Sequence, residues 1–142
     1  MKIAIGADKK GNQLKEVIKK NLEEQGISVV DTTPDGAEDF VESSLAVTKA
    51  VLNNEVEKGI MIDEYGAGSF MASNKVKGMI TANVTDENSA RMTSEHNSAK
   101  AISIGAGIVG ETLAVALVNA YVHAKYEAGR HQVRVDMMNK ML

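Results

Sequence analysis

The sequence predicts an α/β protein with a three-layer, Rossmann or flavodoxin-like fold: a five-stranded parallel sheet with helices on both faces. Short apolar runs alternate with longer segments of helical periodicity along the whole chain. The apolar runs, such as Lys2–Asp8 and Ala101–Gly105, carry apolar residues at successive positions, as expected for strands covered on both sides. A chain of 142 residues with 44% hydrophobic content is typical of one packed domain, which we expect to span residues 1–142.

The first half of the chain contains three of the expected strands. Leu14, Ile18 and Leu22 repeat at a spacing of four, and Gly26 follows them as a helix stop signal. Turn residues at 34–36 close the second strand. The expected elements in this half are strands Lys2–Asp8, Ile27–Thr32 and Gly59–Ile62 and helices Asn12–Gln25 and Phe40–Asn53.

The second half continues the alternation and ends in helices. Asp86 is a predicted N-cap, because its side chain can accept from the first free backbone N–H groups. The strands should follow the order 2-1-3-4-5 with right-handed crossovers, which places a crevice at the carboxyl ends of strands 1 and 3. The expected elements are strands Met79–Val84 and Ala101–Gly105, a short helix Phe70–Lys75, and helices Asp86–His96, Glu111–Ala128 and Arg130–Leu142.

Composition excludes several classes of function. The chain has no cysteine, which rules out disulfides, thiolate metal sites and a cysteine nucleophile of its own. A formal charge of −3 gives no reason to expect nucleic-acid binding. The longest apolar stretch, Leu113–Ala124, is too short to cross a bilayer, and residues 1–8 lack a signal-peptide pattern. We therefore expect a cytoplasmic protein that does not bind membranes, and none of these features calls for a cofactor.

Two glycine-rich segments have a structural and a functional interpretation. Gly105–Gly110 formally matches a dinucleotide fingerprint, but only helix follows it, so close packing is the favoured explanation. Gly66–Ser69 follows the third strand, where successive backbone N–H groups can cradle an anion. The alternative for the second segment is a plain turn.

Acids at the ends of the first and third strands suggest a different class of protein. Asp8 and Asp63 occupy positions that resemble the magnesium and phosphate site of a response-regulator receiver. A receiver also carries a second acid beside the first and a lysine at the end of the fifth strand. Here Ala7 precedes Asp8, and Lys100 comes before the strand.

The C-terminal segment carries a group of basic residues. Arg130 and Arg134 are four positions apart and would share one face of a helix, with His131 between them. Paired guanidinium groups suit a phosphate, because each offers planar bidentate donors. A solvated helix face is the alternative. His96 and Asn97, at the end of an earlier helix, combine a proton shuttle with an amide donor.

Four segments in register resemble ribose-5-phosphate isomerase B and its relatives. They are KIAIGAD at 2–8, GIMIDEYGAGSFMASNK at 59–75, SARMTSEHN at 89–97 and GRHQVRV at 129–135. The resemblance covers nearly the whole chain. It implies a metal-independent aldose–ketose isomerase of phosphorylated sugars, whose active sites draw on two chains.

The resemblance also assigns roles to individual residues. His96 matches the histidine that opens the sugar ring, and Asn97 matches its sugar-binding neighbour. Arg130 and Arg134 match the arginines that hold the phosphate, and Asp8 matches an acid that contacts sugar hydroxyls. The helix expected at 130–142 would then reach the partner chain.

The other half of the family site is altered in the segment that contains Glu64, Gly66 and Gly68. Asp63 replaces the cysteine base, and Tyr65 replaces the threonine of the anion cradle. Lys9 replaces a histidine, and Gly107 replaces an arginine. This pattern resembles the A subunits of galactose-6-phosphate isomerases, whose homologous B subunit keeps the cysteine half. The family implies a hetero-oligomer with two A and two B chains.

Two further hypotheses remain at this point. The first is a self-sufficient isomerase in which Asp63 or Glu64 acts as the base, since burial can raise the pKa of a carboxyl group. The second is a receiver-like or ligand-sensing domain without enzymatic activity.

Overall fold

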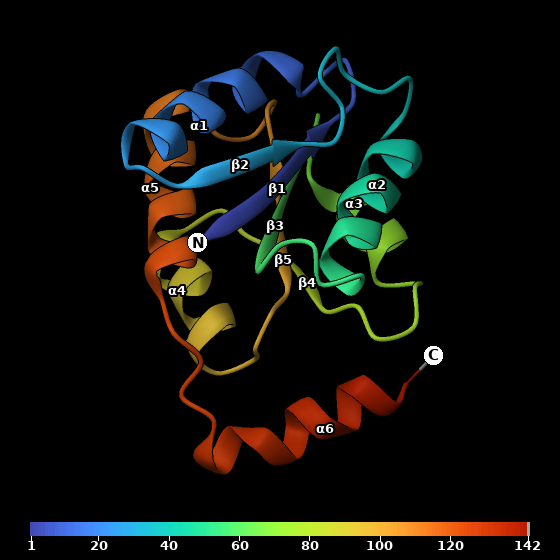
Figure 1. Ribbon diagram of the computed structural model, residues 1–142, viewed down its shortest axis with the longest axis vertical. Helices are drawn as coiled ribbons and strands as arrows, with labels where there is room; N and C mark the ends of the chain where they lie inside the picture. The colour runs from blue at the N-terminus through green and yellow to red at the C-terminus, as the bar shows by residue number, and fades with distance from the viewer. Residues whose placement is uncertain (142) are drawn as a thin grey trace.

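All five strands pair in parallel in one sheet, in the order β2-β1-β3-β5-β4. The computed structural model describes residues 1–141. Helices cover both faces of the sheet, so the predicted α/β class is confirmed (Figure 1). The strands are β1 (Lys2–Ala7), β2 (Ser28–Asp31), β3 (Lys58–Asp63), β4 (Thr81–Asn83) and β5 (Ala101–Gly105).

The helices form two layers. α2 and α3 pack against each other on one side, while α1 and α4 both contact α5 on the other (Figure 1). The last helix, α6, lies apart from both layers at one end of the molecule. The helices are α1 (Asn12–Glu24), α2 (Phe40–Leu52), α3 (Ala67–Ser73), α4 (Glu87–Glu95), α5 (Glu111–His123), the 3₁₀ turn η1 (Gly129–His131) and α6 (Gln132–Lys140).

The predicted strand order 2-1-3-4-5 is wrong in its last two positions, because β5 lies between β3 and β4. Every residue of β5 is buried, as a central strand requires. β4 has three residues and runs from buried Thr81 to exposed Asn83, which suits the edge of a sheet. The predicted adjacency of β1 and β3 is confirmed, so the chain segments after both strands meet at one edge.

The two faces of the sheet pack differently. Isoleucines of β1, β3 and β5 pack with apolar residues of α1, α4 and α5 in the larger core cluster. Glycines let α2 approach the other face closely: a Cβ on Gly6 or Gly59 would lie 2.7 or 2.6 Å from the Val47 side chain. Neither face leaves room for a ligand at the centre of the sheet, so any site must lie at its ends.

Several helix boundaries differ from the prediction. The predicted N-cap at Asp86 is confirmed, since its carboxylate accepts from the Ser89 N–H at 2.8 Å. The helix expected to reach Ala128 ends at His123. Lys58, from the start of β3, donates to the carbonyls of Tyr121 and Ala124 at 2.8 and 2.9 Å and so satisfies the end of this helix.

Three other predicted elements are also shifted. The short helix expected at 70–75 forms at Ala67–Ser73, and the strand expected at 79–84 is confined to Thr81–Asn83. The helix expected at 130–142 begins as the turn η1, becomes α-helical at Gln132 and ends at Lys140. Leu142, the last residue of that prediction, lies outside the described residues. Within residues 1–141, none of the helices is both long and apolar enough to cross a membrane.

Candidate active site

The carboxyl ends of β1 and β3 bring two acids together, as the sequence predicts. Asp63 is 5% exposed and Asp8 is 8% exposed. The Asp63 carboxylate accepts from the Ser69 hydroxyl at 2.9 Å, and Asp8 accepts from the Gly11 N–H at 3.0 Å. Burial raises the pKa of the Asp63 carboxyl, the Ser69 hydroxyl opposes that rise, and the nearby Asp8 charge adds to it.

The predicted anion cradle lies against this same carboxylate. Backbone N–H groups of Gly66 and Ser69 face Asp63 and favour its charged form. They oppose the rise of its pKa but do not cancel it. Gly66 has φ of +79°, and a Cβ there would lie 2.8 Å from the Asn83 side-chain oxygen. A Cβ on Gly68 would lie 2.7 Å from the Phe40 ring. Donors that could bind a ligand anion are therefore directed at a carboxylate of the chain itself.

The remaining residues of this segment face outward or support it. Glu64 is half-buried and the Tyr65 side chain is exposed. A Cβ on Gly105 would lie 2.5 Å from the Tyr65 carbonyl carbon. Close packing therefore explains Gly105, although the neighbour is the loop after β3 and not a helix.

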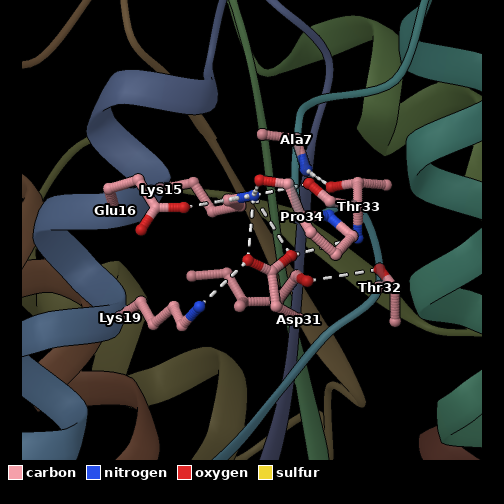
Figure 2. Close-up of polar contacts among 9 residues, drawn as sticks. Ala7, Lys15, Glu16, Lys19, Asp31, Thr32, Thr33 and Pro34 are labelled. Atoms are coloured by element: carbon pink, nitrogen blue, oxygen red, sulfur yellow. Dashed lines mark hydrogen bonds and ion pairs between the residues drawn. The ribbon is translucent and has the colours of Figure 1, made fainter.

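A buried lysine holds the adjoining loop in place. Figure 2 shows Lys15, from α1, among the acceptors at the end of β2. Its fully buried amine lies 2.9 Å from an Asp31 carboxylate oxygen and donates to the carbonyls of Thr33 and Pro34. The Thr33 hydroxyl accepts from the Ala7 N–H at 2.8 Å, which fixes the loop beside Asp8. The sequence analysis missed this lysine, although it lies between Leu14 and Ile18 on the apolar side of α1.

His96 lies at the opposite end of the sheet, because α4 runs antiparallel to the strands. The start of β3 marks that end: Lys58 donates to the Ser94 hydroxyl at 2.9 Å. The His96 ring stacks on the His131 ring with centroids 4.1 Å apart and planes at 14°. Its Nε2 lies 3.4 Å from a Glu127 carboxylate oxygen. Asn97 follows His96 on the surface.

The two arginines are exposed beside this histidine pair. Within residues 1–141, neither Arg130 nor Arg134 forms an ion pair or a side-chain hydrogen bond. Partial burial and the positive charges of His96, Arg130 and Arg134 lower the pKa of His131, while Glu127 raises it. The prediction that both arginines share one α-helix is wrong, because Arg130 lies in η1 and Arg134 in α6. Both nevertheless lie close to His131.

Two imidazoles and a carboxylate are also a donor set that suits zinc-like ions. The ligand atoms of His96, Glu127 and His131 lie within 4.8 Å of one another. A metal binds in the plane of each imidazole, and the two stacked planes do not converge on one point. This geometry fits an acid/base cluster better than a preformed metal centre.

The receiver interpretation is not supported by the geometry. A receiver needs a lysine near its two acids. Lys100 precedes β5, where its amine donates to the Gly78 carbonyl. Asp8 and Asp63 lie at the carboxyl ends of their strands, so the lysine is at the wrong end of the sheet.

The fold and its two polar clusters, one with buried acids and one with histidines and arginines, match an isomerase of phosphorylated sugars. Residues 3–138 match the family described as Ribose/Galactose Isomerase, and the chain belongs to that family. It is 56% identical over 142 residues to a galactose-6-phosphate isomerase subunit LacA from Clostridium acetobutylicum, with all of both chains covered. It is 54% identical over 141 residues to the LacA subunit from Lactococcus lactis subsp. lactis, with 99% of each chain covered.

A solved structure gives the same result for the fold. Ribose-5-phosphate isomerase B from Clostridium thermocellum superposes with a TM-score of 0.94 at 37% identity, covering 99% of this chain and 96% of that one. The findings together support a sugar-phosphate isomerase. They do not name individual site residues, so the roles expected for His96, Asn97, Arg130, Arg134 and Asp8 stay predictions.

Proposed function

We propose that this chain is the A-type subunit of a hetero-oligomeric isomerase that interconverts D-galactose 6-phosphate and D-tagatose 6-phosphate in lactose and galactose catabolism in the cytoplasm. A homologous B subunit, in an assembly of two A and two B chains, supplies the cysteine-bearing half of each working site. The printed names of the relatives at 52–56% identity support the substrate and the subunit role.

The observation that carries the proposal is the distance between the two halves of the site. Asp63 and its cradle lie at the carboxyl ends of the strands, while His96 lies near their amino ends. One sugar phosphate cannot contact both ends of the sheet in a single chain. A working site must therefore combine the His96 end of this chain with the base-bearing end of another.

The division also fits the chemistry. Isomerisation needs a base for the proton beside the carbonyl group and donors directed at the enediolate oxygen. In this chain the Asp63 carboxylate accepts from the Ser69 hydroxyl and faces the cradle N–H groups itself. His96 would open the sugar ring, and Arg130 and Arg134 would anchor the phosphate while the reacting carbons are held in place. Asn97 would contact sugar hydroxyls beside His96. Asp8 would do so at the opposite end of the sheet, beside Asp63.

The last helix supplies a surface for the partner. Val133 and Met137 are four positions apart in α6 and are 64% and 58% exposed, and Met141, just after the helix, is 63% exposed. Val135 is the buried residue of α6. An apolar row of this kind gains stability when a second chain covers it, and that chain would then meet the nearby arginines.

One observation favours a second candidate, in which the chain acts without a B subunit. Burial raises the pKa of Asp63, and a carboxylate with a raised pKa can act as a general base. Glu64 is the adjacent alternative base. A homo-oligomer would then combine Asp63 of one copy with His96 of another.

An assay of the purified chain, alone and mixed with a homologous B-type chain, separates the two candidates. With D-galactose 6-phosphate as substrate, we expect the mixture to form tagatose 6-phosphate and the lone chain to show less than about one hundredth of that rate, a barrier difference of about 2.7 kcal/mol. A rate for the lone chain equal to that of the mixture would establish the second candidate.

A further inference from the structure

Glu127 contacts His96, the histidine that we expect to open the sugar ring. Its carboxylate oxygen lies 3.4 Å from His96 Nε2. His131 stacks on the same ring with centroids 4.1 Å apart. The His96 ring is therefore held by a carboxylate at its edge and by a second ring on its face.

Backbone contacts hold the main chain of Glu127 beside the end of α4. Its N–H donates to the Glu95 carbonyl at 2.9 Å, directly before His96 in the chain. The His131 N–H donates to the Ala128 carbonyl at 3.1 Å. The turn after α5 is thus tied both to the end of α4 and to the start of the arginine-bearing segment.

The same turn contains an unfavourable backbone conformation. Ala128 has φ of 54° and ψ of −127°, a combination that residues with a Cβ rarely adopt. Gly129 follows with φ of 58°. Backbone strain of this kind persists where surrounding contacts hold it, and it concentrates at functional sites. Here it reverses the chain between Glu127 and Arg130, so that the first contacts His96 and the second is exposed to solvent.

We propose that Glu127 is a positioning residue for His96, an inference that rests on the proposed function. At 3.4 Å from Nε2, the carboxylate favours the tautomer that carries its proton on Nε2 and so leaves Nδ1 unprotonated, because the charged neighbour of one ring nitrogen sets the tautomer. Other charges around His96 come from Glu95 and its ion-pair partner Arg91 on α4, and from His131 and the two arginines beyond it.

The tautomer matters for ring opening. Nδ1 takes the proton of the anomeric hydroxyl while the bond between the anomeric carbon and the ring oxygen breaks. The proton is then returned to the ring oxygen, which gives the open hydroxy-aldehyde with no net gain or loss of protons. A ring free to turn, or protonated on Nδ1, cannot accept the proton in that position.

The first test needs no enzyme activity. Nitrogen-15 NMR of the His96 imidazole in the purified chain should show the Nε2–H tautomer in the wild type and a mixture of tautomers in Glu127→Ala. Glu127→Gln keeps an acceptor oxygen and should stay close to the wild type. Glu24→Ala, an exposed glutamate of α1, is the matched control. An unchanged His96 tautomer in Glu127→Ala would overturn the proposal.

The second test uses the assembled enzyme. Glu127→Ala should lower kcat on the ring-closed sugar by about 10- to 100-fold with little change in KM, as for other residues that orient a functional histidine. An acyclic sugar phosphate that lacks the ring-closing hydroxyls should be isomerised at the wild-type rate. Equal losses on both substrates, or no loss on either, would contradict the positioning role. If the wild-type assembly isomerises neither substrate, the proposed function fails. The NMR measurement still shows whether Glu127 sets the tautomer of His96.

Discussion

The charged side chains at the two ends of the sheet differ in burial and in hydrogen bonding. At the carboxyl ends of β1 and β3, Asp63 is buried and hydrogen-bonded within the chain. At the other end, Arg130 and Arg134 are exposed, and no side chain within residues 1–141 neutralises them. A charged group bonded within its own chain stabilises one conformation, whereas an exposed pair of guanidinium groups remains available to an anion. This difference supports the proposal that the end with the arginines binds the phosphate of the substrate.

Packing follows the same division. The loop after β2 is held by the fully buried Lys15 amine, so the end with the altered base site is rigid. By contrast, α6 buries Val135, while Val133 and Met137 of this helix and Met141 just after it are exposed. We therefore expect the end with the arginines to gain stability when the proposed partner chain covers it.

The largest expected effect is at His96. In the assembled enzyme, His96→Ala should lower turnover of the ring-closed sugar by about 10²- to 10⁴-fold, because general acid–base catalysis contributes that much. An acyclic sugar phosphate should lose far less. His123→Ala removes an exposed histidine bonded to Gln25 and serves as the control. Steady-state kinetics on both sugars give the answer, and equal losses would show that His96 does not act in ring opening.

Lys15 tests how much the buried ion pair at the carboxyl end of β2 contributes to stability. Lys15→Met should lower the free energy of unfolding by about 3–5 kcal/mol, because the Asp31 carboxylate keeps only Lys19, at 3.4 Å, as an ion-pair partner and the carbonyls of Thr33 and Pro34 lose their buried donor. Lys20→Met, on the exposed side of the same helix, should change stability by less than about 0.5 kcal/mol. Urea denaturation measures both variants. Equal midpoints would mean that the buried ion pair does not hold this loop.

The arginines test the end that faces the partner. Arg130→Ala or Arg134→Ala should raise KM for the phosphorylated sugar about 30-fold or more, the usual effect of truncating one member of a desolvated charge pair. Lysine at either position should restore only part of the loss, since it lacks the bidentate fork. Lys140→Ala on α6 is the matched control. Wild-type KM values in both alanine variants of an intact oligomer would leave these arginines as a solvated surface.

The smallest effect is expected at Asp63. In the assembled enzyme, Asp63→Asn should keep kcat/KM within about threefold of the wild type, because the cradle at this end is expected to do no chemistry. A loss of about 100-fold with assembly intact would instead favour Asp63 as the base.

The raised pKa of Asp63 also leads to a prediction of how the free energy of unfolding depends on pH. Because burial raises its folded pKa above the unfolded value of 3.8, its contribution is fully present below pH 3.8 and is lost as pH rises through the folded pKa. Asp63→Asn removes this loss, so its stability relative to the wild type should increase from pH 4 to pH 7. Asp35→Asn, at an exposed turn, should show no such trend. Thermal unfolding at both pH values measures the difference, and a falling relative stability would mean that the hydrogen bonds outweigh burial.

The sequence by itself determined the features that depend on neighbouring residues. Apolar periodicity was sufficient for the α/β class, and the N-cap at Asp86 needed only the segment that follows it. The adjacency of β1 and β3 followed from the flavodoxin-like strand order that is typical of this class. The residues of both half-sites were also identifiable, because their types and order match a family.

Contacts between distant segments were decided only by the tertiary structure. β5 lies inside the sheet and β4 at its edge because burial of Ala101–Gly105 removes more apolar surface from water than burial of Thr81–Asn83. The end of α5 depends on Lys58, which is 63 positions away from Tyr121. The contact between His96 and Glu127 depends on a turn that no local periodicity predicts. Each outcome reflects competition among all segments for the same core and the same hydrogen-bond partners, and a window of neighbouring residues does not contain that information.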